Sequence, residues 1–204
     1  MDPLAIYEDL KEKIIWLDLK PGSFLNLVEV AESYGVSRNP VMLALIRLDA
    51  EEWIVRQGVH FVVSPLTIER VREITEIRSI MEAQANIWAM QRITPQGLAE
   101  LVQIRERIQG LGNEVTRKEI VRLDFQFHSL LYRATRNQQV VALLQRLLAH
   151  YLRFWLAGPR EIDPQAFFTE VLEIIRAVEH KDEDRLRAAS AAHIKASLDA
   201  IMGL

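Results

Sequence analysis

Apolar residues recur at helical spacing along almost the whole of the 204-residue chain, and one short segment breaks that period. From Trp53 to Val63 the chain instead has two β-rich runs around Gly58, a pattern typical of a two-stranded hairpin. Helical patterns precede this segment at about 3–17, 28–34 and 38–51, and only helical patterns follow it. The expected fold class is therefore mainly α, with one small β wing.

A domain boundary is expected near residue 66. Ser64-Pro65-Leu66-Thr67 ends the second β run, because proline interrupts a strand. Beyond it the sequence predicts six helices joined by short loops, which is typical of an antiparallel bundle. Their expected ranges are about 67–92, 95–111, 115–135, 138–157, 164–180 and 182–202. We therefore expect a winged helix-turn-helix over residues 1–66 and a six-helix domain over residues 67–204.

Local residue choices mark several helix ends. Gly35 suits the left-handed position after a helix, and Ser37 suits the cap of the helix that follows. Thr94-Pro95 and Asp163-Pro164 each place a capping residue before a proline at the first helical position. These signals set the expected boundaries.

Composition excludes several kinds of site. The chain has no cysteine, which excludes disulfides, thiolate metal sites and cysteine nucleophiles. No stretch approaches the roughly 18 apolar residues of a membrane helix, so we expect a cytoplasmic protein without a membrane partner. The net charge is −3, which gives no sign of a nucleic acid partner and leaves local pattern as the guide.

Two of the predicted helices are joined by a glycine-containing turn and followed by the wing. This is the order of a helix-turn-helix, whose second helix enters the DNA major groove with its N-terminal end. That end offers Ser37, Arg38 and Asn39, with Arg47 further along on a compatible face. Arginine suits guanine or phosphate, and asparagine suits adenine. His60 at the wing tip is a further candidate DNA contact; the alternative for the arginines is an ordinary solvated helix surface.

A specific motif surrounds this segment: an upstream Pro-Gly turn, then Gly-Val-Ser-Arg-x-Pro-Val, then a helical bundle. The residues that carry it are Leu19, Pro21, Gly22, Leu25, Ala31, Gly35, Val36, Ser37, Arg38, Pro40, Val41, Ala44, Leu45, Arg47, Leu48, Ala50 and Glu51. With them the chain resembles the GntR superfamily of transcriptional regulators, in the FadR-like branch with a C-terminal FCD ligand-binding domain. The resemblance implies a homodimer, double-stranded operator DNA with two-fold symmetry, and a small-molecule effector.

Two features depart from the family pattern. The family segment after Pro-Val is usually Arg-Glu-Ala-Leu, whose arginine is a main DNA contact, and here Met42 and Leu43 stand at its first two positions. Residues 1–66 hold six basic and ten acidic side chains, a net charge of −4, whereas most DNA-binding domains are basic. We therefore expect DNA binding that is weaker, or more sensitive to salt, than the resemblance implies. Extra packing or a partner surface is the alternative role of Met42 and Leu43.

The helix expected at 115–135 carries two polar side chains in its inward stripe. Asp124 and His128 lie one turn apart on one face, so they could share a metal ion. His193 lies in the last helix among alanines, which leave space around its imidazole. A buried unpaired carboxylate is costly, so these groups need a partner or a metal. The alternative is an Asp–His ion pair, or a core histidine bonded to backbone.

The resemblance adds a role for these side chains. Asp124, His128 and His193 match positions at which the family holds a divalent metal ion, of the zinc, nickel or manganese class, which helps to bind a carboxylate effector. Without a metal ion, the same side chains would form a polar cluster able to bind a ligand directly.

One metal ligand of the family is missing. A third family histidine falls 22 residues before the last one, where this chain has Val171. Three side chains can still hold an ion, with reduced affinity. His150 and Glu170 are candidate substitutes that the sequence does not place.

Other side chains are candidates for the same ligand site. Arg78 and Glu82 match the family's Glu-x-Arg-x-x-Leu-Glu, in which the arginine faces the cavity and clamps a carboxylate; the alternative is a surface pair. Arg153, with Tyr132 and His150, is a further candidate for the cavity wall. Three aromatic side chains are instead expected in the core or in a dimer contact: Trp88, Phe154 and Trp155.

The expected function is a ligand-responsive regulator of a metabolic operon, most simply a repressor, and not an enzyme. Its expected partners are operator DNA, an effector of the organic acid class and a second copy of the chain. One alternative is a diverged regulator that binds a ligand or a protein but reads DNA weakly. The other is a metal-dependent hydrolase that uses Asp124, His128 and His193 with an activated water, for which the sequence offers no separate nucleophile.

Overall fold

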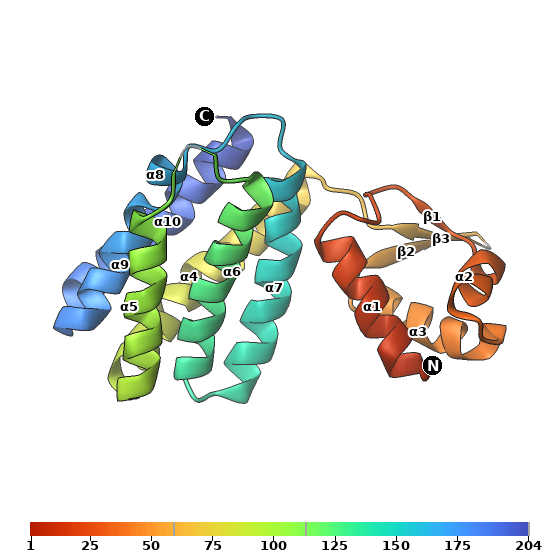
Figure 1. The fold of residues 1–204 in the computed structure, drawn as a ribbon, viewed down its shortest axis with the longest axis horizontal. Helices are drawn as coiled ribbons and strands as arrows, with labels where there is room; N and C mark the ends of the chain where they lie inside the picture. Colours follow the sequence, from red (N-terminus) through yellow and green to blue (C-terminus); the bar gives the residue numbers. More distant parts are fainter. Residues whose placement is uncertain (59, 113, 204) are drawn as a thin grey trace. The chain divides into compact units, whose positions relative to one another are not determined.

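The computed structural model describes residues 1–58, 60–112 and 114–203. The chain forms two compact units, Met1–Thr67 and Ile68–Leu204 (Figure 1). Val59, which belongs to the predicted wing tip, lies outside the described residues. Within the described ranges, the structure contains no helix with both the length and the apolar character needed to span a bilayer.

The first unit packs three short helices against a small antiparallel sheet. The helices are α1 (Pro3–Ile15), α2 (Leu27–Tyr34) and α3 (Arg38–Ala50). The strands are β1 (Phe24–Leu25), β2 (Ile54–Gln57) and β3 (His60–Val63), which lie in the order β1-β3-β2. This arrangement confirms the predicted winged helix-turn-helix.

The wing differs from the predicted two-stranded hairpin, because β1 pairs with the free edge of β3. Gly22 adopts a left-handed φ of 83°, and its N–H donates to the carbonyl of Val63. A strand of two residues is too short to show the alternating pattern from which strands are predicted. The third strand was therefore missed for lack of a sequence signal.

Apolar stripes of α1 and α3 form the core of the first unit. The buried side chains include Ile6, Leu10 and Ile14 on α1, and Val41, Leu45 and Leu48 on α3. Gly35 ends α2 with a φ of 63°, as predicted. Ser37 occupies the N-cap position of α3, as predicted, but its side chain makes no capping hydrogen bond. Because Ser37 is exposed, water can satisfy the first N–H groups of α3 instead.

The second unit is entirely helical over its described residues. Its helices are α4 (Ile68–Arg92), α5 (Pro95–Gln109), α6 (Arg117–Ala134), α7 (Gln138–Ala157), α8 (Pro164–Phe167), α9 (Thr169–His180) and α10 (Glu183–Met202). Thr94 and Asp163 cap α5 and α8 through their side chains, as predicted. The helix predicted at 164–180 is in fact two, because the backbone leaves the helical region at Phe168, whose ring is fully buried.

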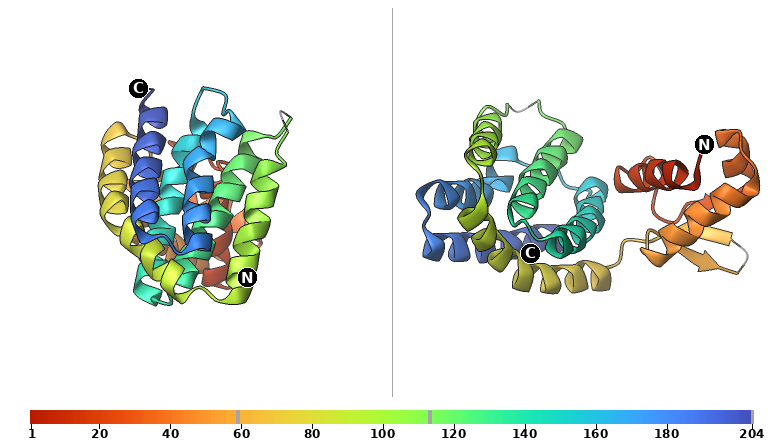
Figure 2. Two further views of the ribbon diagram at one scale, coloured as in Figure 1. Left: turned by 90° about the vertical axis from the view of Figure 1, so that its left-hand side faces the viewer. Right: turned by 90° about the horizontal axis from the view of Figure 1, so that it is seen from below.

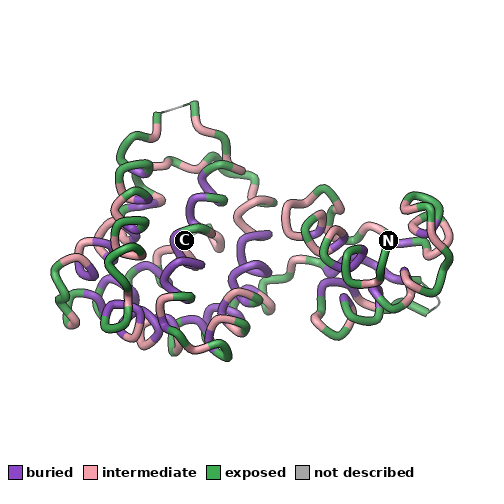
Figure 3. The backbone as a smooth tube through the Cα atoms, turned by 60° about the horizontal axis from the view of Figure 1, so that its bottom comes forward, coloured by how far each residue is buried: buried purple, intermediate pink, exposed green. Residues whose placement is uncertain are grey.

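The helices of the second unit pack around one apolar core. Helix α10 lies against α4 and α9, while α6 lies against α4, α5 and α7. Figure 2 shows these helices side by side, and Figure 3 shows their buried faces turned toward one another within the unit. Helices α4, α6 and α10 therefore converge, and this brings side chains from three distant parts of the sequence together.

Candidate functional site

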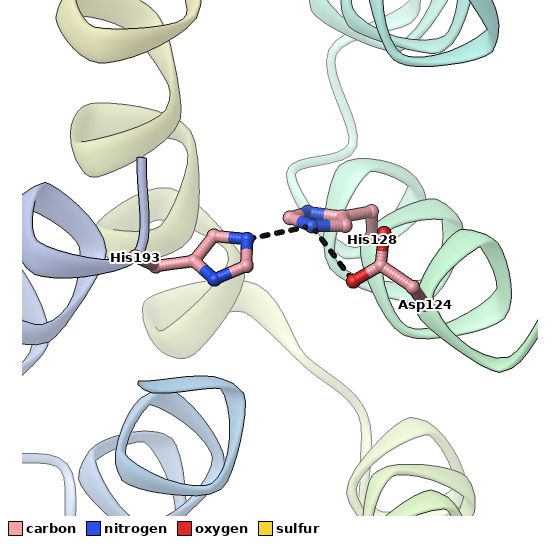
Figure 4. A group of neighbouring side chains, drawn as sticks. All are labelled: Asp124, His128 and His193. Carbon is pink, nitrogen blue, oxygen red and sulfur yellow. Dashed lines mark hydrogen bonds and ion pairs between the residues drawn. The ribbon is translucent and has the colours of Figure 1, made fainter. Parts of the chain in front are cut away.

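A cluster of one acid and two imidazoles lies inside the second unit (Figure 4). Asp124 and His128 stand one turn apart on α6, and His193 faces them from α10. The Nε2 atoms of His128 and His193 are 3.2 Å apart, and His128 Nε2 is 3.5 Å from Asp124 Oδ1. Each residue offers a ligand atom within 4.8 Å of the other two. Side chains separated by more than sixty residues thus meet at one point.

Local sequence explains why these polar groups face inward. On α6 they share a stripe with Ile120, Phe127 and Leu131, all buried, so the helix cannot bury one set without the other. On α10, Ala189 and Ala196 flank His193 one turn away on each side and leave room for its ring.

Burial controls the protonation of all three groups. Burial raises the pKa of Asp124 to about 7, although Arg78 opposes the shift. Burial lowers the pKa of His193 to about 4 and that of His128 well below its ordinary value. Both imidazoles are therefore neutral at pH 7, so a strong ion pair between Asp124 and a charged histidine is not the favoured state.

A buried ion pair lies directly beside the cluster. Arg78 Nε donates to Glu82 Oε1 at 2.6 Å on α4, both side chains are about 2% exposed, and Tyr132 also donates to Glu82. Burial alone would raise the pKa of Glu82, but Arg78 and its other partners lower it to about 2. The alternative of a surface pair is therefore wrong. Glu82 Oε2 also lies 3.9 Å from His128 Nδ1.

These residues fit a divalent metal ion. Asp124 Oδ1 is buried and accepts no hydrogen bond, and two neutral imidazoles direct ring nitrogens to the same place. Carboxylate and neutral imidazole are ligands that zinc and related ions prefer. Asp124, His128 and His193 would hold the ion, while Glu82 beside Nδ1 would favour the tautomer with a free Nε2 lone pair. When bound, the ion would supply positive charge and a coordination position for an anionic group.

The proposed substitute ligands do not join this group among the described residues. Val171 is fully buried on α9 in the apolar core, as a valine should be. His150 is buried on α7, and Glu170 lies at the wall of a neighbouring cavity.

That cavity, of about 200 Å³, adjoins the cluster and is lined by Asp124, His193 and Arg78. Its other lining residues come from α7, the 158–163 loop, α8, α9 and α10: Tyr151, Trp155, Glu161, Ile162, Asp163, Ala166, Phe167, Glu170, Ala196, Ser197 and Ala200. Arg153, Tyr132 and His150, which were predicted to line the cavity, are buried but are not among these lining residues.

Trp155 was predicted to be a core or dimer contact and instead lines the cavity. Its ring packs edge-on against Phe167, with ring centroids 4.7 Å apart. Of the acidic wall residues, Glu170 was predicted only as a possible substitute metal ligand and Asp163 only as a helix cap, and Glu161 was not predicted. Glu161 and Asp163 lie in a loop without periodicity, and no sequence signal indicates which way a loop side chain faces.

The first unit exposes the N-terminal end of α3. Arg38 and Asn39 are exposed in its first turn, and His60 is exposed at the start of β3. Arg47 is exposed too, but its guanidinium lies 3.9 Å from the centre of the Tyr7 ring and its Nε is 3.4 Å from Glu51. Arg47 is therefore held toward α1.

The outer face of α3 is partly apolar. Leu43 and Ile46 are about half exposed, whereas Met42 is half-buried. Leucine at position 43 therefore adds exposed apolar surface to the helix that carries Arg38 and Asn39, while Met42 adds mainly packing.

A winged helix-turn-helix in one chain with a helical unit that encloses an acid–imidazole cluster defines a class of DNA-binding transcription regulators. Two family models match this chain: bacterial regulatory proteins of the gntR family over residues 4–62, and the FCD domain over residues 73–196. The chain therefore belongs to the GntR family of transcription regulators with an FCD domain, and the predicted resemblance is confirmed.

Individual proteins agree with this assignment. The chain is 29% identical over 194 residues to an uncharacterized regulator, YdhC, of Bacillus subtilis, covering 93% of this chain and 86% of that protein. It is 26% identical to the transcriptional repressor RspR of Escherichia coli, covering 93% and 84%. The solved structure of McbR from E. coli matches with a TM-score of 0.85 at 24% identity, covering 98% of this chain and 97% of that one. The last likeness concerns the fold alone.

Proposed function

We propose that this protein is a homodimeric repressor of a metabolic operon, which reads a two-fold symmetric operator through α3 and responds to a small carboxylate effector. The observation that carries the proposal is the buried Asp124–His128–His193 cluster beside a cavity, in a chain whose other unit is a winged helix-turn-helix. A relative named a transcriptional repressor supports the direction of regulation.

In this proposal the second unit binds the effector. Asp124, His128 and His193 would hold a divalent ion, which would supply positive charge for the effector's carboxylate, and the Arg78 guanidinium would donate hydrogen bonds to that carboxylate. An effector regulates only through different affinities for two arrangements of the protein. An apolar patch on α4 supports a dimer contact, since Ile77 and Ile80 lie on one helix face and are 43% and 77% exposed.

The first unit reads DNA in this proposal. Arg38 and Asn39 contact base edges or phosphates from the first turn of α3, with Ser37 and His60 beside the backbone. Leu43 and Ile46 contact thymine methyl groups, which suit apolar side chains in the major groove. Arg47 can contact DNA only if its guanidinium breaks its contacts with Tyr7 and Glu51.

The substitution Arg38→Ala tests the DNA-reading role. We expect it to weaken binding to the DNA upstream of the protein's own gene by about 1–3 kcal/mol, and to lower the slope of log affinity against log salt by about one. The measurement is fluorescence anisotropy over a salt series, with a scrambled duplex as the reference sequence.

Arg146→Ala is the matched control, because Arg146 is exposed on α7 in the other unit. Equal affinity of wild type and Arg38→Ala would reject the role of α3. If the wild-type protein binds both duplexes with equal affinity, the second candidate function is favoured. That candidate is a diverged regulator that still binds a ligand but no longer recognises an operator sequence. The specific observations behind that candidate are the exposed Leu43 and Ile46 and the engaged Arg47.

A further inference from the structure

The cavity is lined by more acidic than basic side chains. A ligand with two carboxylates would need a second lysine or arginine, which the described part of this lining lacks. Glu161, Asp163 and Glu170 line it together with Asp124, and Arg78 is the one lysine or arginine among the described lining residues. The charge of Arg78 is already balanced by Glu82, at 2.6 Å. Besides Asp124, the cavity lining therefore carries three acidic side chains, of which Glu161 and Asp163 are exposed and Glu170 is half-buried.

The hydrogen-bond donors near these acids are also engaged. Tyr151 and Trp155 both donate to Ser197 Oγ, at 2.9 and 3.3 Å. Asp163 accepts from the N–H of Gln165, which keeps its carboxylate at the start of α8. These two aromatic donors are thus not available to a second anionic group.

Aromatic rings complete this wall. Trp155 and Phe167 pack against each other and line the cavity, whereas the Tyr151 ring is already covered by the Arg78 guanidinium, 4.4 Å from its centre. Aromatic faces attract ammonium groups, and nearby carboxylates add to the attraction. At the Asp124–His128–His193 cluster, the buried Oδ1 of Asp124 accepts no hydrogen bond and lies 3.5 Å from His128 Nε2, where an ion and an anionic group would bind.

We propose that the effector is dipolar, with a carboxylate at the Asp124–His128–His193 end and an amine at the wall formed by Glu161, Asp163, Glu170 and the aromatic rings. The ligand class is an amino acid whose amine is separated from its carboxylate by a short carbon chain. This inference rests on the proposed function, since it specifies the effector of that same cavity.

Four probes of equal chain length test the inference: γ-aminobutyrate, butyrate, succinate and putrescine. Binding to zinc-loaded full-length protein is measured by calorimetry and by tryptophan fluorescence, since Trp155 lines the cavity. β-Alanine and longer amino acids of the same type cover other spacings. We expect γ-aminobutyrate, or its best homologue, to bind about tenfold more tightly than the matched monocarboxylate and dicarboxylate.

The variant with Glu161→Gln, Asp163→Asn and Glu170→Gln should lose this preference and still bind butyrate. Asparagine replaces Asp163 in this variant because asparagine, like aspartate, caps a helix. Asp184→Asn, an exposed acid outside the cavity wall, is the matched control.

The possible outcomes distinguish the dipolar effector from the broader proposal of a carboxylate effector. Succinate binding as tightly as the amino acid, or an unchanged preference in the triple variant, would overturn the dipolar effector and leave the carboxylate effector intact. Putrescine binding as tightly as γ-aminobutyrate would reject the carboxylate end. No binding by any member of the series would count against both.

Discussion

Replacing Glu82 by glutamine should lower the free energy of unfolding of the helical unit by about 3–5 kcal/mol. The side chains of Glu82 and Arg78 are fully enclosed on α4 and are joined at 2.6 Å. The amide keeps the shape of the carboxylate but leaves the buried guanidinium without a balancing charge. Urea unfolding followed by circular dichroism measures the loss.

The double variant Arg78→Leu with Glu82→Leu is the control, because it removes both charges. It should be closer to wild type in stability than Glu82→Gln is, since no uncompensated charge remains. A single variant that costs less than about 1 kcal/mol, or a double variant less stable than the single one, would show that the pair is not enclosed as described.

The effect of Glu82→Gln should also depend on pH. Because the folded pKa of Glu82 is lowered from 4.5 to about 2, its contribution to stability is fully present above pH 4.5 and is lost as the pH falls toward 2. The difference between wild type and Glu82→Gln should therefore shrink over that window.

Removing any ligand of the proposed metal site should remove the ion. We expect Asp124→Ala and His193→Ala each to lower zinc affinity by more than about 100-fold. Mutating a residue that merely hydrogen-bonds to a metal ligand already lowers metal affinity by about 10–100-fold. Elemental analysis of protein purified without chelator gives the occupancy, and competition with a chromogenic chelator gives the affinity.

His180→Ala is the matched control, because it removes an exposed imidazole outside the cluster. Metal content unchanged by Asp124→Ala and His193→Ala would reject this site. If the wild-type protein binds no divalent ion under these conditions, the metal site is rejected, and the cluster can act only by contacting the effector directly.

The sequence predicted those parts of the structure that depend on local pattern. The inward stripe of α6 and the position of His193 among alanines follow from helical periodicity, and the ends at Gly35, Thr94 and Asp163 follow from capping chemistry. The meeting of Asp124, His128 and His193 was expected because the residues matched a family pattern; periodicity alone does not say which helices are neighbours.

The missed features depend on tertiary contacts. Strand β1 is too short to carry a pattern, and the break at Phe168 interrupts a sequence that is helical on both sides. The contact of Arg47 with Tyr7 brings together residues forty positions apart. The acidic and aromatic cavity wall arises from a loop and three helices that no single stretch of sequence describes.

In the proposed function, occupancy of the buried cluster controls the DNA affinity of the winged helix-turn-helix unit of the same chain. This control is tested most directly by the dissociation constant for the upstream duplex, measured by fluorescence anisotropy at about 0.15 M salt, with protein that is either zinc-loaded or stripped by chelator. We expect a difference of at least about fivefold between the two forms, absent in Asp124→Ala. Identical dissociation constants for zinc-loaded and stripped wild-type protein would contradict it.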